Sequence, residues 1–273
     1  MPIGIFDSGF GGLTVMKEIV RQLPQYDYIY LGDNARAPYG PRSFETVYKY
    51  TLQAIKWFFE HDCALVILAC NTASAKALRT IQQNDLPRMD PSRRVLGIIR
   101  PVTENANHFS QSKHIGILGT EGTVSSRSYV IEIQKFFPEL KVTQEACPMW
   151  VPLVENGEHE SDGADYFVEK HISHILQVDP QIDAIVLGCT HYPLLMNKIK
   201  KYLPGHVKVI SQGEIVAESL AKYLQRHPEI ESRCEKNGQR QYYTTESPEI
   251  FNGVANIFCD KPINAMRTSL EGY

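Results

Sequence analysis

Two cysteines that occupy matching settings in the two halves of the chain are the residues whose types and spacing point most directly to chemistry. Cys70 follows the apolar run Leu65–Ala69, and Cys189 follows the apolar run Ile185–Gly188. A short aliphatic run that ends in small polar residues is typical of a buried parallel strand that delivers a side chain to a ligand crevice. Two thiols, one from each half, could face each other across a single substrate. Proton transfer by two bases needs that arrangement.

The residues that follow each cysteine favour a functional interpretation over a structural one. A free cysteine is most often a small buried hydrophobic residue. Asn71 and Thr72, however, place hydrogen-bonding groups at the strand end, where they suit a carboxylate or an amine. Cys189 has the stronger case because Thr190 and His191 follow it directly. His191 could act as an acid or base, or as an electrostatic partner of the thiol.

Two other kinds of cysteine chemistry remain as alternatives. Structural zinc sites usually show clustered ligand pairs, whereas Cys189 and His191 form one Cys-x-His without a second pair. We therefore expect no metal. A cysteine hydrolase would use one thiol as a nucleophile, and the second cysteine would then be unexplained.

A glycine-rich loop, Asp7–Gly12, follows the first apolar run and opens a helical pattern, so its backbone N–H groups could hold an anion. Two nucleotide-binding interpretations fail, because a dinucleotide fingerprint needs glycine at Thr14 and a phosphate loop needs lysine at Phe10. The plain alternative is a tight turn between a strand and a helix. The carboxylate of Asp7 and the hydroxyl of Ser8 at the carboxyl end of a strand favour a site.

Two further segments carry weaker signals. The loop Gly32–Pro41 is dense in proline and glycine, which alone would explain a turn. A substrate contact from Tyr39 or from the backbone of Gly40 is a further hypothesis. Glu155 follows an apolar stretch and precedes a turn, and its spacing alone indicates an ordinary solvated acid.

The bulk composition excludes several classes of protein. The 273 residues are 43% hydrophobic and 22% charged with a net charge of -3, as expected for an ordinary globular core without a basic stripe for nucleic acid. No apolar stretch approaches the ~20 residues of a membrane span. A strand that starts at Ile3 leaves no room for a signal peptide. The six cysteines are irregularly spaced without a CxxC pair, so we expect reduced thiols and a cytoplasmic protein.

Strand and helix patterns alternate along the chain, which predicts an α/β fold with mainly parallel sheets covered by helices. The predicted strands are Ile3–Phe6, Tyr28–Leu31, Ala64–Ala69, Val95–Ile98, His114–Leu118, Lys141–Glu145, Ala184–Leu187 and Val207–Ile210. The predicted helices are Leu13–Leu23, Ser43–His61, Ser74–Gln83, Val124–Phe136, Gly163–Gln177, Leu194–Tyr202 and Glu214–Gln225.

The chain also partly repeats itself. The segment Gly4–Gly9 resembles Gly116–Glu121, and the two cysteine strands are separated by a similar offset. Similar offsets for two separate motifs indicate two related α/β halves rather than a short-period solenoid. The segment Gln239–Ile257 has the pattern of a strand followed by a helix, and it could return to complete the first half.

Taken together, these motifs resemble the glutamate racemase family, a cofactor-independent branch of the aspartate/glutamate racemases. The matching segments are Asp7–Gly9, Pro38–Gly40, Cys70–Ser74, Gly119–Thr120, Thr123–Val124, Val151–Glu155 and Gly188–Pro193. They occur in the same order and span most of the chain.

The resemblance implies a role for each matching residue. Cys70 and Cys189 are the two proton-transferring thiols, with Cys70 serving D-glutamate and Cys189 serving L-glutamate. Asp7 assists the first thiol, and Glu155 and His191 assist the second. The implied substrate-binding residues are Asp7, Ser8, Pro38, Tyr39, Gly40, Asn71, Thr72, Thr120, Thr190 and His191.

The resemblance also implies two pseudo-symmetric, three-layer α/β domains with the active site in the cleft between them. We expect residues 1–98 and 209–273 to form the first domain and residues 99–208 the second. The expected ligand is glutamate, with no cofactor, no metal, no nucleic acid and no membrane; a homodimer is one option because the family often dimerises. The product would supply D-glutamate for peptidoglycan.

Arg100 departs from the family pattern and has no explanation in the sequence. Some members carry an N-terminal extension linked to activation by a cell-wall precursor, and we expect this form of regulation to be absent. The remaining alternatives are a racemase of aspartate or another small acid, and a two-lobed protein that binds an amino acid without chemistry.

Overall fold

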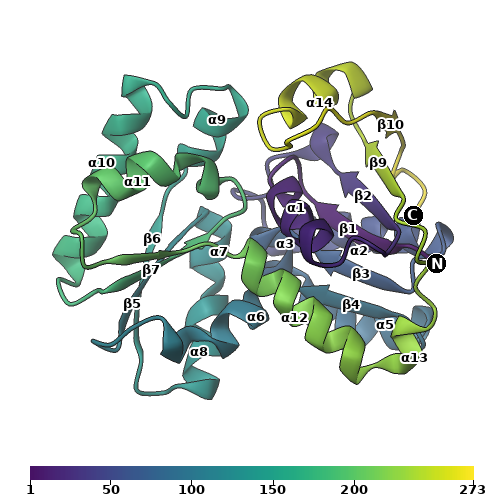
Figure 1. The fold of residues 1–273 in the computed structure, drawn as a ribbon, viewed down its shortest axis with the longest axis horizontal. Helices are drawn as coiled ribbons and strands as arrows, with labels where there is room; N and C mark the ends of the chain where they lie inside the picture. Colours follow the sequence, from purple (N-terminus) through teal and green to yellow (C-terminus); the bar gives the residue numbers. More distant parts are fainter.

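The computed structural model describes residues 1–273, which form two lobes, each built on one sheet (Figure 1). The first sheet contains, in spatial order, β10 (Ala265–Arg267), β9 (Arg240–Thr244), β2 (Tyr28–Gly32), β1 (Ile3–Asp7), β3 (Leu65–Leu68) and β4 (Arg94–Gly97). The second contains β6 (Lys141–Ala146), β5 (His114–Gly119), β7 (Ala184–Gly188) and β8 (Lys208–Ile210). Every pairing is parallel, so the predicted fold class is confirmed.

The helices flank these strands in chain order. They are α1 (Gly12–Gln22), α2 (Phe44–Glu60), α3 (Asn71–Lys76), α4 (Leu78–Thr80), α5 (Leu86–Met89), α6 (Ile99–Glu104), α7 (Glu121–Ser126), α8 (Ser128–Phe136), α9 (Trp150–Glu155), α10 (Asp162–Val178), α11 (Met196–Tyr202), α12 (Gly213–Arg226), α13 (Pro228–Glu231) and α14 (Pro248–Ala255). Short 3-10 helices cover Asn34–Arg36, Ala106–His108 and Tyr192–Leu195, and a π-helical turn covers Ile81–Asp85. None of these helices is long and apolar enough to cross a membrane.

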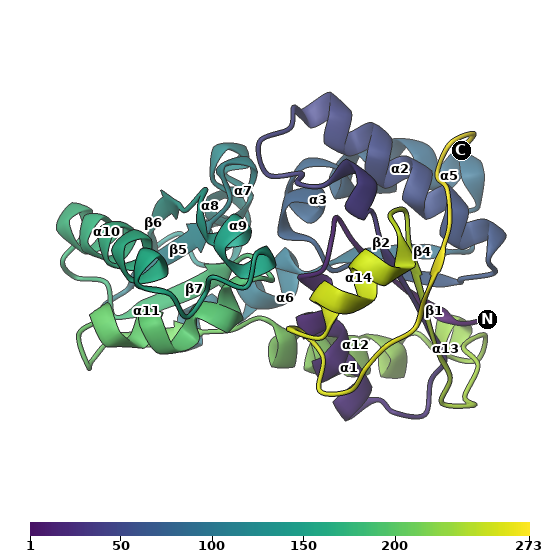
Figure 2. The same ribbon diagram turned by 90° about the horizontal axis from the view of Figure 1, so that it is seen from above.

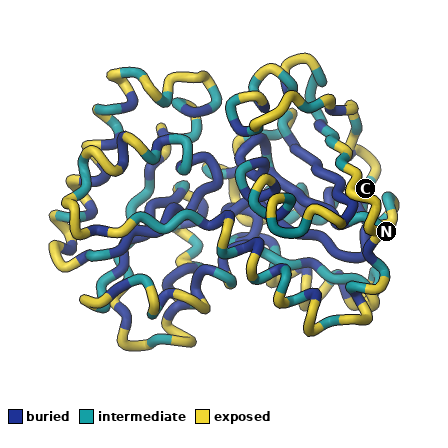
Figure 3. The backbone as a smooth tube through the Cα atoms, viewed as in Figure 1, coloured by how far each residue is buried: buried dark blue, intermediate teal, exposed yellow.

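Both faces of the first sheet are covered, which explains why its central strands β2 and β3 have continuous apolar sequences. Alternate residues of β1 point to opposite faces: Ile5 packs in the core beneath α1 and α12, whereas Phe6 packs in the core beneath α2. Figure 2 shows α2 and α12 on opposite sides of this sheet. The central strands of both lobes, β1, β2, β3, β5 and β7, are buried along most of their length (Figure 3).

The two sheets confirm the internal repeat. The order β2-β1-β3-β4 in the first sheet corresponds to β6-β5-β7-β8 in the second. In this correspondence β3 and β7 are equivalent, and each is followed by one of the two cysteines, Cys70 and Cys189. The glycine loop after β1 likewise corresponds to the turn at Thr120 after β5. The repeat therefore brings equivalent strand ends to the junction between the lobes.

The C-terminal segment returns to the first sheet, as predicted. β9 pairs with β2, and β10 adds one more parallel strand outside it. The chain crosses between lobes twice, after β4 and again after β8. The domain limits 1–98, 209–273 and 99–208 stay a prediction.

Several predicted helices differ from the structure in their bounds. The stretch Val124–Phe136 is two helices, because Arg127 adopts a left-handed conformation (φ 55°) between α7 and α8. The helix predicted from Ser74 begins at Asn71 instead, directly after Cys70. The pattern also missed the short helices α6 and α9, which carry Pro101 and Pro152. Proline and short length conceal such helices from a periodicity analysis.

Candidate active site

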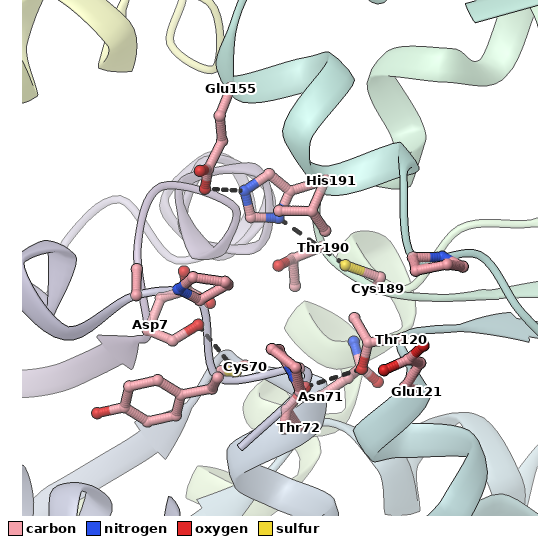
Figure 4. A pocket seen from close by; sticks show the side chains of 18 of the residues that line it. Asp7, Cys70, Asn71, Thr72, Thr120, Glu121, Glu155, Cys189, Thr190 and His191 are labelled. Carbon is pink, nitrogen blue, oxygen red and sulfur yellow. Dashed lines mark hydrogen bonds and ion pairs between the residues drawn. The ribbon is translucent and has the colours of Figure 1, made fainter. Parts of the chain in front are cut away.

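A cavity of about 240 Å³ lies between the two lobes. It is smaller than the ~300–1,000 Å³ typical of sites for drug-sized ligands, which favours a small molecule. Figure 4 shows that its side chains come from both halves of the chain. The lining residues are Asp7, Ser8, Ala37, Pro38, Tyr39, Gly40, Pro41, Cys70, Asn71, Thr72, Thr120, Glu121, Pro148, Val151, Pro152, Glu155, Cys189, Thr190 and His191. All of the residues predicted for the site therefore meet at one place.

Cys70 occupies the turn between β3 and α3 and is buried. Its Sγ atom accepts a hydrogen bond from the backbone N–H of Ala73 at 3.4 Å and lies 3.3 Å from the hydroxyl of Ser8. Burial raises the pKa of this thiol to about 12, and the nearby Asp7 carboxylate adds to the effect. Cys70 is consequently a protonated thiol at neutral pH.

Asp7 ends β1 and is 1% exposed. One carboxylate oxygen accepts the backbone N–H of Gly9 at 2.8 Å, and the other has no hydrogen-bond partner. Burial raises the pKa of Asp7 to about 6, although His191 and backbone N–H groups oppose this effect. At neutral pH the carboxylate is therefore mostly ionised, with one oxygen free to accept a proton.

Cys189, His191 and Glu155 form a continuous chain on the other side of the cavity (Figure 4). The Sγ atom of Cys189 lies 3.8 Å from Nδ1 of His191, and Nε2 of His191 lies 2.9 Å from a carboxylate oxygen of Glu155. Burial lowers the pKa of His191, but its hydrogen bonds with Cys189 and Glu155 outweigh burial and raise the pKa to about 10. Nδ1 of His191 faces the sulfur of Cys189 and Nε2 faces the carboxylate of Glu155, which suits an imidazolium ion that donates on both sides.

Glu155 thus differs from the solvated acid that its local sequence indicates. Its side chain is 26% exposed and is paired with His191. The residue ends the short helix α9, which the periodicity missed. The family resemblance, and not the spacing, identified this position.

The glycine loop has a steric role that the sequence did not reveal. A Cβ atom on Gly11 would lie 2.3 Å from Oγ1 of Thr190 and 2.4 Å from Nδ1 of His191. A Cβ atom on Gly9 would lie 3.4 Å from a carboxylate oxygen of Glu155. The loop after β1 therefore lacks side chains where Thr190, His191 and Glu155 of the other lobe approach it.

Four threonine and serine hydroxyls line the cavity where they were predicted: Ser8, Thr72, Thr120 and Thr190. Thr72 and Thr120 come from opposite lobes, and their hydroxyls lie 3.0 Å apart. The backbone carbonyl of Thr190 accepts the hydroxyl of Thr14 at 2.9 Å, which connects the second lobe to α1. Hydroxyl groups of both lobes therefore converge on the cavity.

Tyr39 and Asn71 line the cavity, but their side-chain polar atoms are engaged elsewhere. The Tyr39 hydroxyl donates to Asp33 at 2.5 Å, and the Asn71 amide bonds with Gln212 and Tyr129. The Tyr39 hydroxyl and the Asn71 side-chain amide are therefore not free to bind a ligand. The backbone groups of these two residues can still contact a ligand in the cavity. Pro38 and Gly40 line the same wall.

The structure adds residues that the sequence analysis missed and places one outside the site. Glu121, Pro148 and Val151 also line the cavity. Val151 lies in the matching segment Val151–Glu155 and Glu121 in the repeated segment Gly116–Glu121, but neither was singled out, and Pro148 lies in no motif. Arg100 is exposed and pairs with Glu104 at 2.8 Å on the surface of α6. Its departure from the family pattern does not affect the cavity lining.

Comparisons with known proteins agree with this geometry. A family model described as Asp/Glu/Hydantoin racemase matches residues 3–220. A glutamate racemase from Geobacter metallireducens is 40% identical over 257 residues, which cover 94% of this chain and 92% of the relative. A glutamate racemase isoform from Bacillus anthracis has a similar crystal structure, with TM-score 0.89, 34% identity, and coverage of 98% of this chain and 97% of the other. The structure of the Francisella tularensis glutamate racemase in complex with D-glutamate has TM-score 0.89, 30% identity, and coverage of 100% and 98%.

Proposed function

The chain belongs to the Asp/Glu/Hydantoin racemase family, and we propose how its cavity interconverts L-glutamate and D-glutamate, with Cys70 and Cys189 exchanging protons at opposite faces of the α-carbon. The observation that carries this mechanism is the separate acid–base partner of each thiol. Asp7 accompanies Cys70, and the pair of His191 and Glu155 accompanies Cys189. One thiol can therefore accept a proton while the other supplies one.

Conversion of L-glutamate begins with the Cys189 side. The thiolate of Cys189, stabilised by the His191 cation, removes the α-proton and becomes a thiol. Cys70, which starts as a thiol, donates its proton to the opposite face of the same carbon. As that proton leaves, protonated Asp7 replaces it on Cys70. D-glutamate forms with both cysteines as thiols and Asp7 as a carboxylate, so the proton gained at Cys189 balances the one lost from Asp7.

Conversion of D-glutamate uses the reverse order. Each unit of pKa corresponds to about 1.4 kcal/mol, so a standing Cys70 thiolate beside the Asp7 carboxylate is strongly unfavourable. We propose that Asp7 accepts the thiol proton as Cys70 takes the α-proton of the substrate, so no free thiolate accumulates. The free oxygen of Asp7 gives that proton a place to go.

The negative charge that develops on the substrate needs hydrogen-bond donors because the mechanism uses no electron-withdrawing cofactor. The backbone N–H groups of Asn71 and Thr72, the first two residues of α3, have no partner within the helix, whereas the Ala73 N–H donates to Cys70 Sγ. We propose that they bind the α-carboxylate, with the hydroxyls of Thr72 and Thr120 nearby. Donors fixed in place before the reaction stabilise developing charge more than mobile water does.

The direct test incubates the purified, reduced protein with L-glutamate in D2O without added cofactor. Optical rotation and the α-proton NMR signal are followed together, with L-aspartate in a parallel reaction. We expect both signals to decay with L-glutamate and to persist with L-aspartate. Exchange without inversion would contradict the two-thiol mechanism. Inertness toward both substrates, with binding retained, would favour a non-catalytic amino-acid-binding protein.

The reaction should have a bell-shaped pH dependence. As pH falls through about 6, Asp7 becomes protonated and can no longer accept the Cys70 proton. As pH rises through about 10, His191 loses the charge that stabilises the Cys189 thiolate. We therefore expect kcat/KM for D-glutamate to fall on both sides of this interval.

Asp7→Asn should remove the acidic limb of this profile and lower the plateau of kcat/KM about 100-fold. An acidic limb that persists in this variant would exclude Asp7 as its source.

Gly11→Ala tests the close approach of the two lobes. The added methyl group would overlap Thr190 and His191, so we expect His191 to move and kcat/KM to fall by about 100-fold, a typical cost of a displacement near 1 Å. Gly253→Ala in α14 is the control, because a Cβ atom there meets nothing within 4 Å. Steady-state kinetics of both variants check the prediction. Equal activity of the two variants would contradict it.

We further infer that the product serves peptidoglycan synthesis and that the reaction takes place in the cytoplasm, where the six free cysteines stay reduced. A homodimer stays a prediction, which light scattering of the purified protein can check.

A further inference from the structure

A buried polar network lies beside the cavity, formed by Asn71, Tyr129 and Gln212. The three residues are 2%, 0% and 3% exposed. The Asn71 amide donates to the Gln212 carbonyl oxygen at 2.7 Å, and the Asn71 carbonyl oxygen accepts the Tyr129 hydroxyl at 2.8 Å and the Gln212 amide at 3.1 Å. The Gln212 amide also donates to the Tyr129 hydroxyl. Each member is thus bonded to both of the others.

The network joins three elements that are distant in sequence. Asn71 is the first residue of α3 and directly follows Cys70. Tyr129 lies on α8 in the second lobe, and Gln212 lies between β8 and α12, where the chain crosses back to the first lobe. The network therefore spans the junction of the two lobes at one of their two covalent connections.

Tyr129 also contacts the strand that carries the other thiol. A Cβ atom on Gly188 would lie 3.4 Å from the Tyr129 ring, so the ring packs against the residue before Cys189. The hydroxyl of the same tyrosine bonds the residue after Cys70. The Tyr129 side chain thus links the Asn71 side chain, next to Cys70, with the backbone next to Cys189.

The network is suited to fixing geometry rather than to binding the substrate. Its side-chain polar groups are directed at one another, and none of them is left without a partner. A fully bonded buried network holds its members in one arrangement, and loss of one member leaves the others unpaired at substantial cost. Asn71 can therefore change its position only if the whole network rearranges.

We propose that Gln212 and Tyr129 are positioning residues that set the spacing between the Cys70 and Cys189 thiols across the substrate. This proposal rests on the two-thiol reaction proposed above. Proton delivery to the second face requires both sulfur atoms to lie in line with the α-carbon, whereas removal and return of a proton on one face requires only one of them. A loosened network should therefore impair inversion more than exchange.

The test measures two rates in D2O for each variant: inversion of L-glutamate, and deuterium incorporation into the L-glutamate that remains. Tyr129→Phe keeps the ring beside Gly188 and removes only the hydroxyl, and Gln212→Leu removes both amide contacts. We expect kcat to fall about 10-fold and 100-fold respectively, with KM changed less than threefold. The ratio of exchange to inversion should rise at least fivefold in both.

Two further variants separate positioning from general destabilisation. Tyr28→Phe removes an equally buried hydroxyl, which donates to the Leu23 carbonyl at 2.9 Å far from the cavity, and it should behave as wild type. Gln212→Glu keeps an acceptor for the Asn71 amide and should lie between wild type and Gln212→Leu.

An unchanged ratio of exchange to inversion in Tyr129→Phe, with wild-type kcat or with both rates lowered equally, would overturn the proposal. An inactive wild-type protein would instead refute the proposed function. Because Tyr129→Phe preserves the packing of the ring, its result decides the question even if Gln212→Leu fails to fold.

Discussion

Replacing either Cys70 or Cys189 with alanine should reduce the inversion of glutamate to about 10⁻⁴ of the wild-type rate or less. Each thiol is buried at the end of a strand and has its own acid–base partner, Asp7 for Cys70 and His191 for Cys189. No other group in either half of the cavity combines these two features. No neighbouring residue can substitute, because Asp7 and His191 act through the thiols. Polarimetry with both enantiomers as substrate measures this loss.

The cysteine variants need a control that separates chemistry from packing. Cys63 lies just before β3, the strand whose other end carries Cys70, and it is buried, with its thiol directed at the carbonyl of His61. Cys63→Ala should therefore lower the free energy of unfolding, because the missing sulfur leaves a small cavity. The variant should keep a near-normal kcat. The two-thiol mechanism would be wrong if Cys63→Ala lost as much activity as Cys70→Ala. It would also be wrong if Cys70→Ala or Cys189→Ala still inverted glutamate.

The second large effect is expected from the charge beside Cys189. His191→Asn removes the cation that accompanies the thiolate and leaves Glu155 without its partner. We expect kcat/KM to fall about 1,000-fold, within the range for loss of a positioned acid–base group. Iodoacetamide labelling of Cys189 in the wild type and in the variant provides a second readout of the surroundings of this thiol, because the thiolate is the form that reacts.

Glu155→Gln is a milder substitution at the same pair, and it complements His191→Asn. Glutamine can still accept a hydrogen bond from His191 but carries no charge, so the histidine stays in place with a lower pKa. We expect kcat/KM to fall about 10-fold. The decline of activity on the alkaline side should begin at a lower pH than in the wild type. Equal losses in Glu155→Gln and His191→Asn would indicate that the charge of Glu155, rather than the imidazole, is the decisive group.

The order of strands and helices and the two thiols were predictable from the sequence because their signals are local. Leu65–Leu68 and Ala184–Gly188 are aliphatic runs covered on both faces, so each has a continuous apolar pattern wherever it sits in the fold. Parallel strands bring their carboxyl ends to one edge, so cysteines at those ends had to lie near a crevice. The return of the C-terminal segment to the first half was likewise anticipated from a strand-then-helix pattern, and the structure shows that it pairs with β2.

Contacts between residues that are distant in sequence were decided by the tertiary structure alone. Glu155 meets His191 because α9 and the end of β7 pack together within the second lobe, and Gly11 meets Thr190 because the two lobes face each other. No local pattern records either contact. The direction of the Asn71 amide away from the cavity depends on Gln212, which lies 141 residues further along the chain. The break at Arg127 depends on a single left-handed backbone conformation that helical periodicity does not register. Periodicity and residue type thus determined which elements form and which side chains could do chemistry. The packing within each lobe decided which acid–base partner each thiol has, and the packing of one lobe against the other brought the two thiols to one cavity.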